Sequence, residues 1–200
     1  QETRWKGDGS RMIEGAGRRY KFHCKGGEER ALGVGVLVAE KLVEQVIKVR
    51  KCSDRILILR VLVGNCALNL VSVYAPQVGR SMEEKESFWI ELGKVVSKVS
   101  AQKGLVVCGD MNGHVGMQTD GFEGVHGGEG YGVRNIEEML LEFVDARGLV
   151  VLNTLFNKED NRKVTYKLGG NSSQIDYFLM RKADRKLVMD VKVIPGEPCL

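Results

Sequence analysis

The chain has 200 residues and a net charge of +4, with 43% of its residues hydrophobic and 28% charged. This length predicts a single domain spanning residues 1–200 with a sizeable core, and the balanced composition excludes a disordered chain. No apolar run approaches the roughly 18 residues of a membrane span, so we expect no membrane partner.

The first half of the chain alternates apolar runs with turn signals. Residues 33–38 and 56–63 predict strands, and Gly64-Asn65 predicts a turn into a third strand over residues 66–74. Ser81-x-x-Glu84 is a capping box that predicts a helix ending at Gly104, followed by a strand over residues 105–109. The apolar face of this helix predicts core packing, and comprises Phe88, Trp89, Leu92, Val95, Val96 and Val99.

The second half begins with a glycine-rich stretch, residues 113–134, which predicts a long loop. Asn135-x-x-Glu138 predicts the start of a second helix that stops at Gly148. Strands are predicted at residues 149–154, about 163–168, 174–180 and 188–194, the last closed by Pro195. Because strands outnumber helices and the helices lie between them, the pattern indicates an α/β or α+β fold with a large β component.

Cysteine usage and charge distribution limit the environment and the partners. The five cysteines are scattered, with no CxxC spacing, which favours reduced thiols in an intracellular protein over disulfides or a zinc site. Residues 1–30 hold eight Lys and Arg against five Asp and Glu, and residues 158–192 hold nine against five. Such segments suit a phosphate backbone, although composition alone favours two solvated faces.

The pattern that most clearly indicates chemistry is Gly109-Asp110-Met111-Asn112, directly after the apolar run 105–108. A strand that stops at a carboxylate and a carboxamide brings both side chains to the edge of a sheet. Asp is a hard oxygen ligand or a general base, and Asn is a neutral donor suited to developing negative charge. Gly-Asp-x-Asn is also an ordinary turn, which is the simpler interpretation of this segment taken alone.

An ordered set of further segments accompanies this one. In chain order they are Gln1-Glu2-Thr3-Arg4-Trp5, Ser72-Val73-Tyr74-Ala75-Pro76-Gln77, Gly109 to Gly116, the glycine-rich run Gly127 to Asn135, Asn153-Thr154 and Gln174-Ile175-Asp176-Tyr177. In these segments the chain resembles the endonuclease/exonuclease/phosphatase superfamily, and in particular the endonuclease domains of RTE-type LINE retrotransposons and the related craniofacial development protein 2 family. The resemblance extends over essentially all 200 residues.

The resemblance implies a DNase I-like fold: an α/β sandwich of two mixed sheets flanked by helices. It also implies a first strand carrying an Asn and a last strand with an Asp-His or Gln-His motif. Neither is found in this sequence, so we expect a domain truncated at both ends that lacks the first and last strands. The histidines of the chain are His23, His114 and His126.

The resemblance also assigns roles at the centre of the site. Glu2 corresponds to the ligand of Mg²⁺, for which Mn²⁺ is a possible substitute, and Tyr74 to a tyrosine that hydrogen-bonds the phosphate. Asp110 corresponds to the carboxylate that orients or deprotonates water, and Asn112 to the amide that holds a phosphate oxygen. Without the resemblance, Glu2 is a solvated charge near a terminus and Tyr74 is equally well a core aromatic residue.

The remaining roles are at the C-terminal end of the sequence. Asp176 corresponds to the residue that orients the catalytic His, as in triad logic, and that His has no counterpart here. Thr165 and Tyr166 correspond, more weakly, to residues that line the substrate. His114 and His126 are candidates for a substitute acid–base group, but loop histidines beside glycines more commonly pack or face solvent.

These expectations together predict a Mg²⁺-dependent phosphodiester hydrolase, a retrotransposon-derived endonuclease with DNA as its partner. One alternative is a phosphatase or RNA deadenylase on the same fold, since a fold does not fix a substrate. Another is a non-catalytic remnant that binds nucleic acid or protein, which the missing His motif favours. The expected location is intracellular, and nuclear if DNA is the substrate; the oligomeric state is left open.

Overall fold

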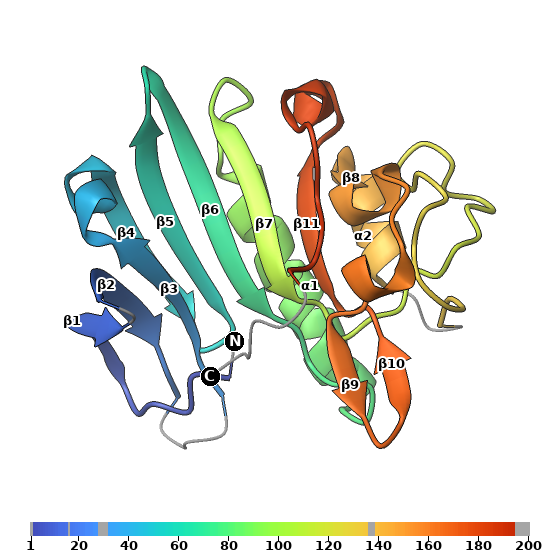
Figure 1. Ribbon diagram of the computed structural model, residues 1–200, viewed down its shortest axis with the longest axis horizontal. Helices are drawn as coiled ribbons and strands as arrows, with labels where there is room; N and C mark the ends of the chain where they lie inside the picture. Colours follow the sequence, from blue (N-terminus) through green and yellow to red (C-terminus); the bar gives the residue numbers. More distant parts are fainter. Residues whose placement is uncertain (1, 16, 28–31, 136–138, 195–200) are drawn as a thin grey trace. The chain divides into compact units, whose positions relative to one another are not determined.

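The computed structural model describes residues 2–15, 17–27, 32–135 and 139–194 (Figure 1). Its contacts divide the chain into unit 1, Gln1–Pro76 with Arg80–Asp110, and unit 2, Gln77–Gly79 with Met111–Leu200. No helix in the described ranges has both the length and the apolar character required to cross a membrane.

Unit 1 contains a small antiparallel sheet with the order β1-β2-β3. Its strands are β1 (Asp8–Gly15), β2 (Arg18–Lys25) and β3 (Val34–Ala39). The third strand matches the prediction for residues 33–38, whereas β1 and β2 were not predicted. No residue of β1 is buried, so this strand lacks the alternation of polar and apolar residues that marks a half-buried strand.

Four more strands of unit 1 lie side by side in Figure 1, in the order β4-β5-β6-β7. They are β4 (Val46–Ser53), β5 (Ile56–Val63), β6 (Cys66–Tyr74) and β7 (Gly104–Asp110). The predicted hairpin is confirmed, because Val63 pairs with Cys66 across the turn. Strand β4 was not predicted, and a short 3-10 helix, η1 (Glu40–Gln45), precedes it.

Strands β6 and β7 are parallel, and α1 (Met82–Ser97) provides the crossover that parallel strands require. The predicted cap is present, because the Ser81 hydroxyl accepts a hydrogen bond from the Glu84 N–H at 3.3 Å. The predicted end at Gly104 is wrong: the helix stops at Ser97. A turn closed by Lys103 N–H and Ser100 C=O, 3.0 Å apart, follows before β7.

The two sheets of unit 1 pack against each other through one apolar cluster. Val34 of β3, Leu57 of β5 and Tyr74 of β6 are its buried members. The Ser72 hydroxyl also donates to the Gly35 carbonyl at 3.4 Å, which links β6 to β3. Because neighbouring residues of a strand point to opposite faces, Ile56 and Ile58 lie on the face of β5 away from this cluster.

Unit 2 contains α2 (Met139–Ala146), β8 (Leu149–Val151), β9 (Tyr166–Leu168), β10 (Asn171–Ser173) and β11 (Asp176–Arg181). Strands β8 and β11 pair antiparallel, and β9 and β10 form a small hairpin. Among its described residues, the unit also has three 3-10 helices: η2 (Leu152–Leu155), η3 (Asp160–Arg162) and η4 (Lys182–Leu187). The predicted cap residue Glu138 lies outside the described residues.

Several predicted strands of unit 2 are shorter than expected, and one is wrong. The predicted strand 149–154 ends at Val151, where η2 begins, and the strand expected near 163–168 starts only at Tyr166. Residues 188–194 form no strand. Met189 is 91% exposed, so the apolar residues of this segment do not belong to a buried face.

The glycine-rich stretch 113–134 is a loop, as predicted. The Arg134 guanidinium donates hydrogen bonds to the carbonyls of Val115, Gln118 and Asp120, which ties the two ends of the loop together. A side chain at position 130 would collide with the Gly116 carbonyl, because a Cβ placed there would lie 1.8 Å from that oxygen. The described residues therefore form a mixed α/β fold consistent with the predicted DNase I-like class.

Candidate functional site

Glu2 and Tyr74, which are 72 positions apart in sequence, meet in unit 1. The Tyr74 hydroxyl donates to Glu2 Oε1 at 2.5 Å, and Arg4 donates to Glu2 Oε2 at 3.2 Å. The hydrogen bond from Tyr74 is the main cause that holds the pKa of Glu2 below its ordinary value of 4.5, against a smaller opposing effect of burial. Glu2 is therefore a carboxylate at neutral pH and carries the charge that a cation requires.

Backbone hydrogen bonds along the small sheet place Glu2. The Thr3 N–H donates to the Gly33 carbonyl at 3.1 Å, and the Gly26 N–H donates to the Gly7 carbonyl at 2.6 Å. A Cβ at Gly26 would lie 1.7 Å from the Trp5 carbonyl oxygen, so this close approach of two backbones requires glycine. The N-terminal segment therefore runs beside the small sheet without forming a strand of its own.

Tyr74 itself is 3% exposed at the end of β6. Burial is the main cause that raises the pKa of its phenol, and the charges of Glu2 and Asp110 add to this effect. Tyr74 is therefore a protonated hydrogen-bond donor throughout the physiological range.

Asp110 is the last residue of β7 and pairs directly with Tyr74 of β6 in the parallel register. The Ala75 N–H donates to the Asp110 carbonyl at 2.8 Å, so the two strands remain paired up to their ends. Glu2, Tyr74 and Asp110 thus gather at one edge of unit 1. This is the edge at which open parallel strands present side chains to a ligand.

Arg55 is a residue of this region that sequence reasoning missed. It is buried, and its guanidinium donates to the Tyr74 carbonyl at 3.2 Å and to Glu84 at 2.6 Å, while lying 5.3 Å from the centre of the Tyr74 ring. It therefore fixes the end of β6 and joins it to α1. A lone Arg between two predicted strands gave no signal of this role.

Asn112, Thr165 and Asp176 belong to unit 2. Asn112 has a φ of 47°, in the left-handed region that Asn tolerates better than most residues. The preceding N–H, of Met111, donates to the Ile175 carbonyl at 2.8 Å. The chain that carries Asn112 therefore runs beside the segment that leads into β11.

The Thr165 hydroxyl organises the start of β11. Its oxygen accepts from the N–H groups of Ile175 and Asp176 at 3.0 and 3.2 Å. The hydroxyl also bonds the Asp176 carboxyl, which partly offsets the dominant effect of burial, and the pKa of Asp176 remains raised. Tyr166, which follows Thr165 and begins β9, is 48% exposed.

Asn153 also holds the start of β11, through two hydrogen bonds to its backbone. Its amide nitrogen donates to the Asp176 carbonyl at 3.4 Å, and its amide oxygen accepts from the Phe178 N–H at 2.8 Å. Asn153-Thr154 is one of the segments that carry the resemblance, which assigns it no role. The structure shows that Asn153 positions the backbone of Asp176.

The two candidate histidines of unit 2 differ. His126 is 3% exposed, bonds the Gly116 carbonyl and accepts from the Gly128 N–H, and burial lowers its pKa, so it packs as a neutral ring. His114 Nδ1 lies 2.7 Å from Asn135 Oδ1, and the residues on either side of His114 bond the hydroxyl of Tyr177, next to Asp176. Of these two, His114 is the histidine whose segment borders β11.

Within the described ranges, no group of three or more His, Cys, Asp or Glu side chains is close enough to hold a metal ion. Mg²⁺ usually keeps several waters and takes only one or two carboxylates, so a cluster of three is not required. Glu2 is ionised, and both Glu2 and Asp110 raise the pKa of Tyr74 through their charges. Carboxylate oxygens are the donor type that a hard divalent cation prefers.

Comparisons with known proteins give relatives in sequence and neighbours in structure. No family model matches the chain. It is 28% identical over 201 residues to craniofacial development protein 2 of Bos taurus and to that of Tragulus javanicus, with 99% of the chain aligned in each case. The chain spans about a third of the length of these curated relatives.

Solved structures show the same fold. The endonuclease domain of TRAS1, a telomere-specific non-LTR retrotransposon, has a TM-score of 0.58 at 15% identity, covering 92% of this chain and 71% of that domain. D. rerio TDP2 in complex with a single-stranded DNA product has a TM-score of 0.53 at 12% identity, covering 81% of this chain and 62% of TDP2. An endonuclease/exonuclease/phosphatase family protein from Leptotrichia buccalis has a TM-score of 0.51 at 13% identity, covering 80% of this chain and 60% of that protein.

The chain therefore has the DNase I-like fold that these solved structures share. The resemblance that the ordered motifs indicate is confirmed, by sequence for craniofacial development protein 2 and by fold for the endonuclease domain of TRAS1.

Proposed function

We propose that this chain is a Mg²⁺-dependent phosphodiester hydrolase of the retrotransposon-derived endonuclease type, with DNA as its substrate. The observation that carries the proposal is the gathering of Glu2, Tyr74 and Asp110 at the ends of adjacent strands in unit 1. Two negative carboxylates beside a neutral phenolic donor suit the hydrolysis of a phosphate ester. The TDP2 structure with single-stranded DNA supports a nucleic-acid substrate on this fold, and a DNA substrate implies the nucleus.

The proposed roles divide between water and phosphate. The Asp110 carboxylate accepts a proton from the attacking water and orients it, as a general base does. The Asn112 amide donates a hydrogen bond to a phosphate oxygen, where negative charge increases in the transition state. The Tyr74 hydroxyl has one proton, which it donates to Glu2 in this structure; in the proposed substrate complex it donates that proton to a phosphate oxygen instead. Because the pKa of Tyr74 is raised, the phenol keeps its proton for this purpose.

Glu2 is the proposed metal ligand, with Asp110 as the neighbouring oxygen donor, and Mn²⁺ as a substitute ion. A bound divalent cation would neutralise phosphate charge and lower the pKa of a coordinated water. Arg4 and Tyr74 both hydrogen-bond Glu2 in this structure, so these two side chains keep it in place, and the Arg4 guanidinium also compensates its charge.

The proposed roles in unit 2 concern the leaving group and the substrate face. Asp176 orients an imidazole that acts as general acid, and Thr165 and Asn153 hold Asp176 in place. Within this sequence, His114 is the proposed imidazole, because its segment borders β11. Tyr166, half exposed beside Thr165, is the proposed contact to substrate.

Nicking of supercoiled plasmid by the 200-residue chain, with Mg²⁺ or with EDTA, tests the proposal. We expect weak cleavage that EDTA abolishes. Asp110→Ala should reduce it about 10²–10⁴-fold, the usual contribution of a general base. Asp120→Ala, which removes an exposed carboxylate in the glycine-rich loop, is the matched control and should cut at the unaltered rate. Cutting that survives EDTA, or equal losses in both variants, would show that the assignment is wrong.

One second function has a specific observation in its favour. Glu2 is already hydrogen-bonded by Tyr74 and Arg4, and Asp176 bonds Thr165 rather than an imidazole. Both arrangements suit a domain that binds nucleic acid without cutting it. DNA binding of unaltered strength with no EDTA-sensitive nicking would favour this function over the first.

A further inference from the structure

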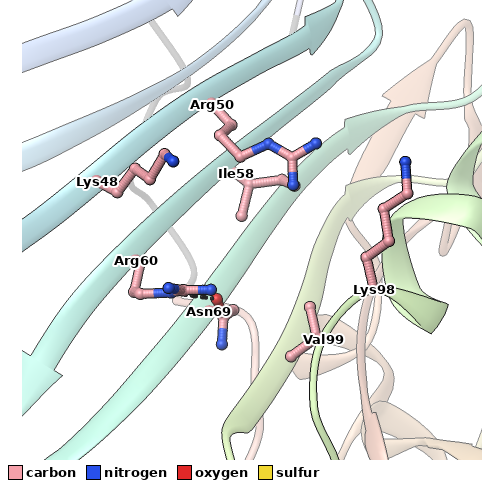
Figure 2. A pocket seen from close by; sticks show the side chains of 7 residues that line it. All are labelled: Lys48, Arg50, Ile58, Arg60, Asn69, Lys98 and Val99. Carbon is pink, nitrogen blue, oxygen red and sulfur yellow. Dashed lines mark hydrogen bonds between the residues drawn. The ribbon is translucent and has the colours of Figure 1, made fainter.

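A basic pocket lies in unit 1 at a distance from the candidate site (Figure 2). Its lining residues are Lys48, Arg50, Ile58, Arg60, Asn69, Lys98 and Val99. Four of these seven side chains are cations, and none of the seven is acidic. They come from β4, β5, β6 and the residues directly after α1.

The strand register explains why these cations share one face. Lys48 pairs with Arg60, and Arg60 pairs with Asn69, so these three residues form one row across β4, β5 and β6. Arg50 pairs with Ile58 in a neighbouring row on the same face. Two cations placed directly opposite on neighbouring strands repel each other and destabilise the pair.

This charge is only partly compensated: the charge of Glu91 acts on the Cys52 thiol together with those of Arg50 and Lys98, and Glu91 accepts a hydrogen bond from Ser53. No ion pair joins any of the four cations to a carboxylate among the described residues. Arg60 Nε donates to Asn69 Oδ1 at 3.0 Å, and the buried Asn69 amide donates to the Gly104 carbonyl at 3.0 Å, so one cation is held rigidly by a neutral partner. Lys48, Arg50 and Lys98 are exposed.

The pocket is separate from the candidate site. Asn69 and Tyr74 are five residues apart along β6, a separation of roughly 17 Å at the rise of an extended strand. They also point to opposite faces, because the parity of their positions differs. Val99, which follows α1, lines the pocket, so the pocket lies on the face of the sheet that α1 covers. Tyr74 lies on the opposite face, which packs against the small sheet.

The geometry points to a nucleic-acid backbone as the ligand: we propose that Lys48, Arg50, Arg60 and Lys98 bind successive phosphates of a DNA strand outside the candidate active site. Neighbouring strands are about 4.8 Å apart, and alternate residues of a strand about 6.7 Å apart. The cations therefore form an array rather than converging on one small anion. A chain of repeated phosphates neutralises such an array, and Ile58 and Val99 form its apolar floor.

This inference rests on the proposed function for the identity of its ligand, but it needs no catalysis. The test is binding of a fluorescent single-stranded oligonucleotide to the full 200-residue chain by anisotropy, in EDTA, across a salt series. Arg50→Gln with Lys98→Gln should reduce the slope of log affinity against log salt by about 1.4, since each phosphate contact on a single strand contributes about 0.7.

The matched control is Arg18→Gln with Lys41→Gln, which removes one Arg and one Lys from exposed positions of β2 and η1. Its salt slope should equal that of the unaltered chain, although its net charge has fallen equally. A second variant, Arg50→Lys with Lys98→Arg, keeps both charges and should restore the slope, which excludes misfolding as the cause.

Three outcomes would overturn the inference: an equal reduction of the slope in both Gln variants, an unchanged slope in both, or complete displacement of the oligonucleotide by inorganic phosphate at constant ionic strength. The last would identify a site for free phosphate. Failure of the proposed function is distinguishable from these outcomes. If the chain does not nick DNA but the Gln variants show the predicted slopes, the proposed function fails and the inference holds. If the chain nicks DNA but the slopes are unchanged, only the inference fails.

Discussion

The two units hold their candidate residues by different means. In unit 1, Tyr74 and Asp110 are register partners at the ends of the adjacent strands β6 and β7. Tyr74 also belongs to the buried cluster between the two sheets. In unit 2, Asp176 begins a six-residue strand, and the side chains of Thr165 and Asn153 hold its backbone. Packing of apolar side chains therefore places the first group, and individual hydrogen bonds place the second.

This difference predicts different responses to mutation, and the largest effect is expected in the core of unit 1. Leu57→Ala should lower the free energy of unfolding by about 2–5 kcal/mol, because it removes a fully buried side chain from the cluster that holds Tyr74. Denaturant melts with a linear extrapolation measure this loss. Leu62→Ala, in the same strand but 44% exposed, is the control and should cost less than about 0.5 kcal/mol. Equal losses would contradict a packing-based site.

The corresponding test in unit 2 removes one oxygen. The Tyr177 hydroxyl donates to the Gln174 carbonyl at 2.6 Å and accepts from the Val115 N–H at 3.4 Å, within a buried region. Tyr177→Phe should cost about 1–3 kcal/mol, because buried polar groups lose their partner.

Tyr166→Phe is the matched control for that test, since this hydroxyl belongs to a half-exposed residue of β9, and it should be neutral. Amide hydrogen exchange should also increase around Val115 in Tyr177→Phe alone. Unchanged exchange there would mean that hydrogen bonds do not hold this part of unit 2.

The same contrast explains what the sequence could predict. Apolar runs reveal long, half-buried strands, so the ends of β6 and β7, and with them Tyr74 and Asp110, follow from the pattern. Arg55, Thr165 and Asn153 form hydrogen bonds with backbone groups that are distant in sequence. Such bonds leave no periodic pattern in the sequence, so only the folded chain reveals them. Strands β1 and β2 were missed because their residues are largely exposed. Residues 188–194 have the apolar content of a strand but form none. Apolar content is local, whereas a strand also requires a pairing partner, which the local sequence does not reveal.

The pKa values of two carboxyl groups, Asp176 in unit 2 and Glu2 in unit 1, are shifted in opposite directions. Burial raises the pKa of Asp176 above its ordinary 3.8, so its contribution to stability is fully present below pH 3.8 and is lost as the pH rises through the raised pKa. Thr165→Val removes the hydroxyl that offsets this effect, and the pKa of Asp176 should rise further. Carboxyl-detected NMR titration measures it. Thr119→Val, in the glycine-rich loop, is the matched control and should leave that pKa in place.

The smallest effect is expected at Glu2, whose pKa is lowered, chiefly by the Tyr74 hydroxyl. A lowered pKa contributes stability that is present above pH 4.5 and is lost as the pH falls through the folded-state value. Because the Glu2 side chain is 36% exposed, solvent screens this contribution. Tyr74→Phe should return the pKa of Glu2 towards 4.5 in the same NMR titration, and the loss of this hydrogen bond to a partly exposed carboxylate should change stability little above that pH. Tyr20→Phe, on β2, should not move it. A Glu2 carboxyl that titrates unchanged in Tyr74→Phe would mean that Arg4, rather than the phenol, holds the charge of the proposed metal ligand.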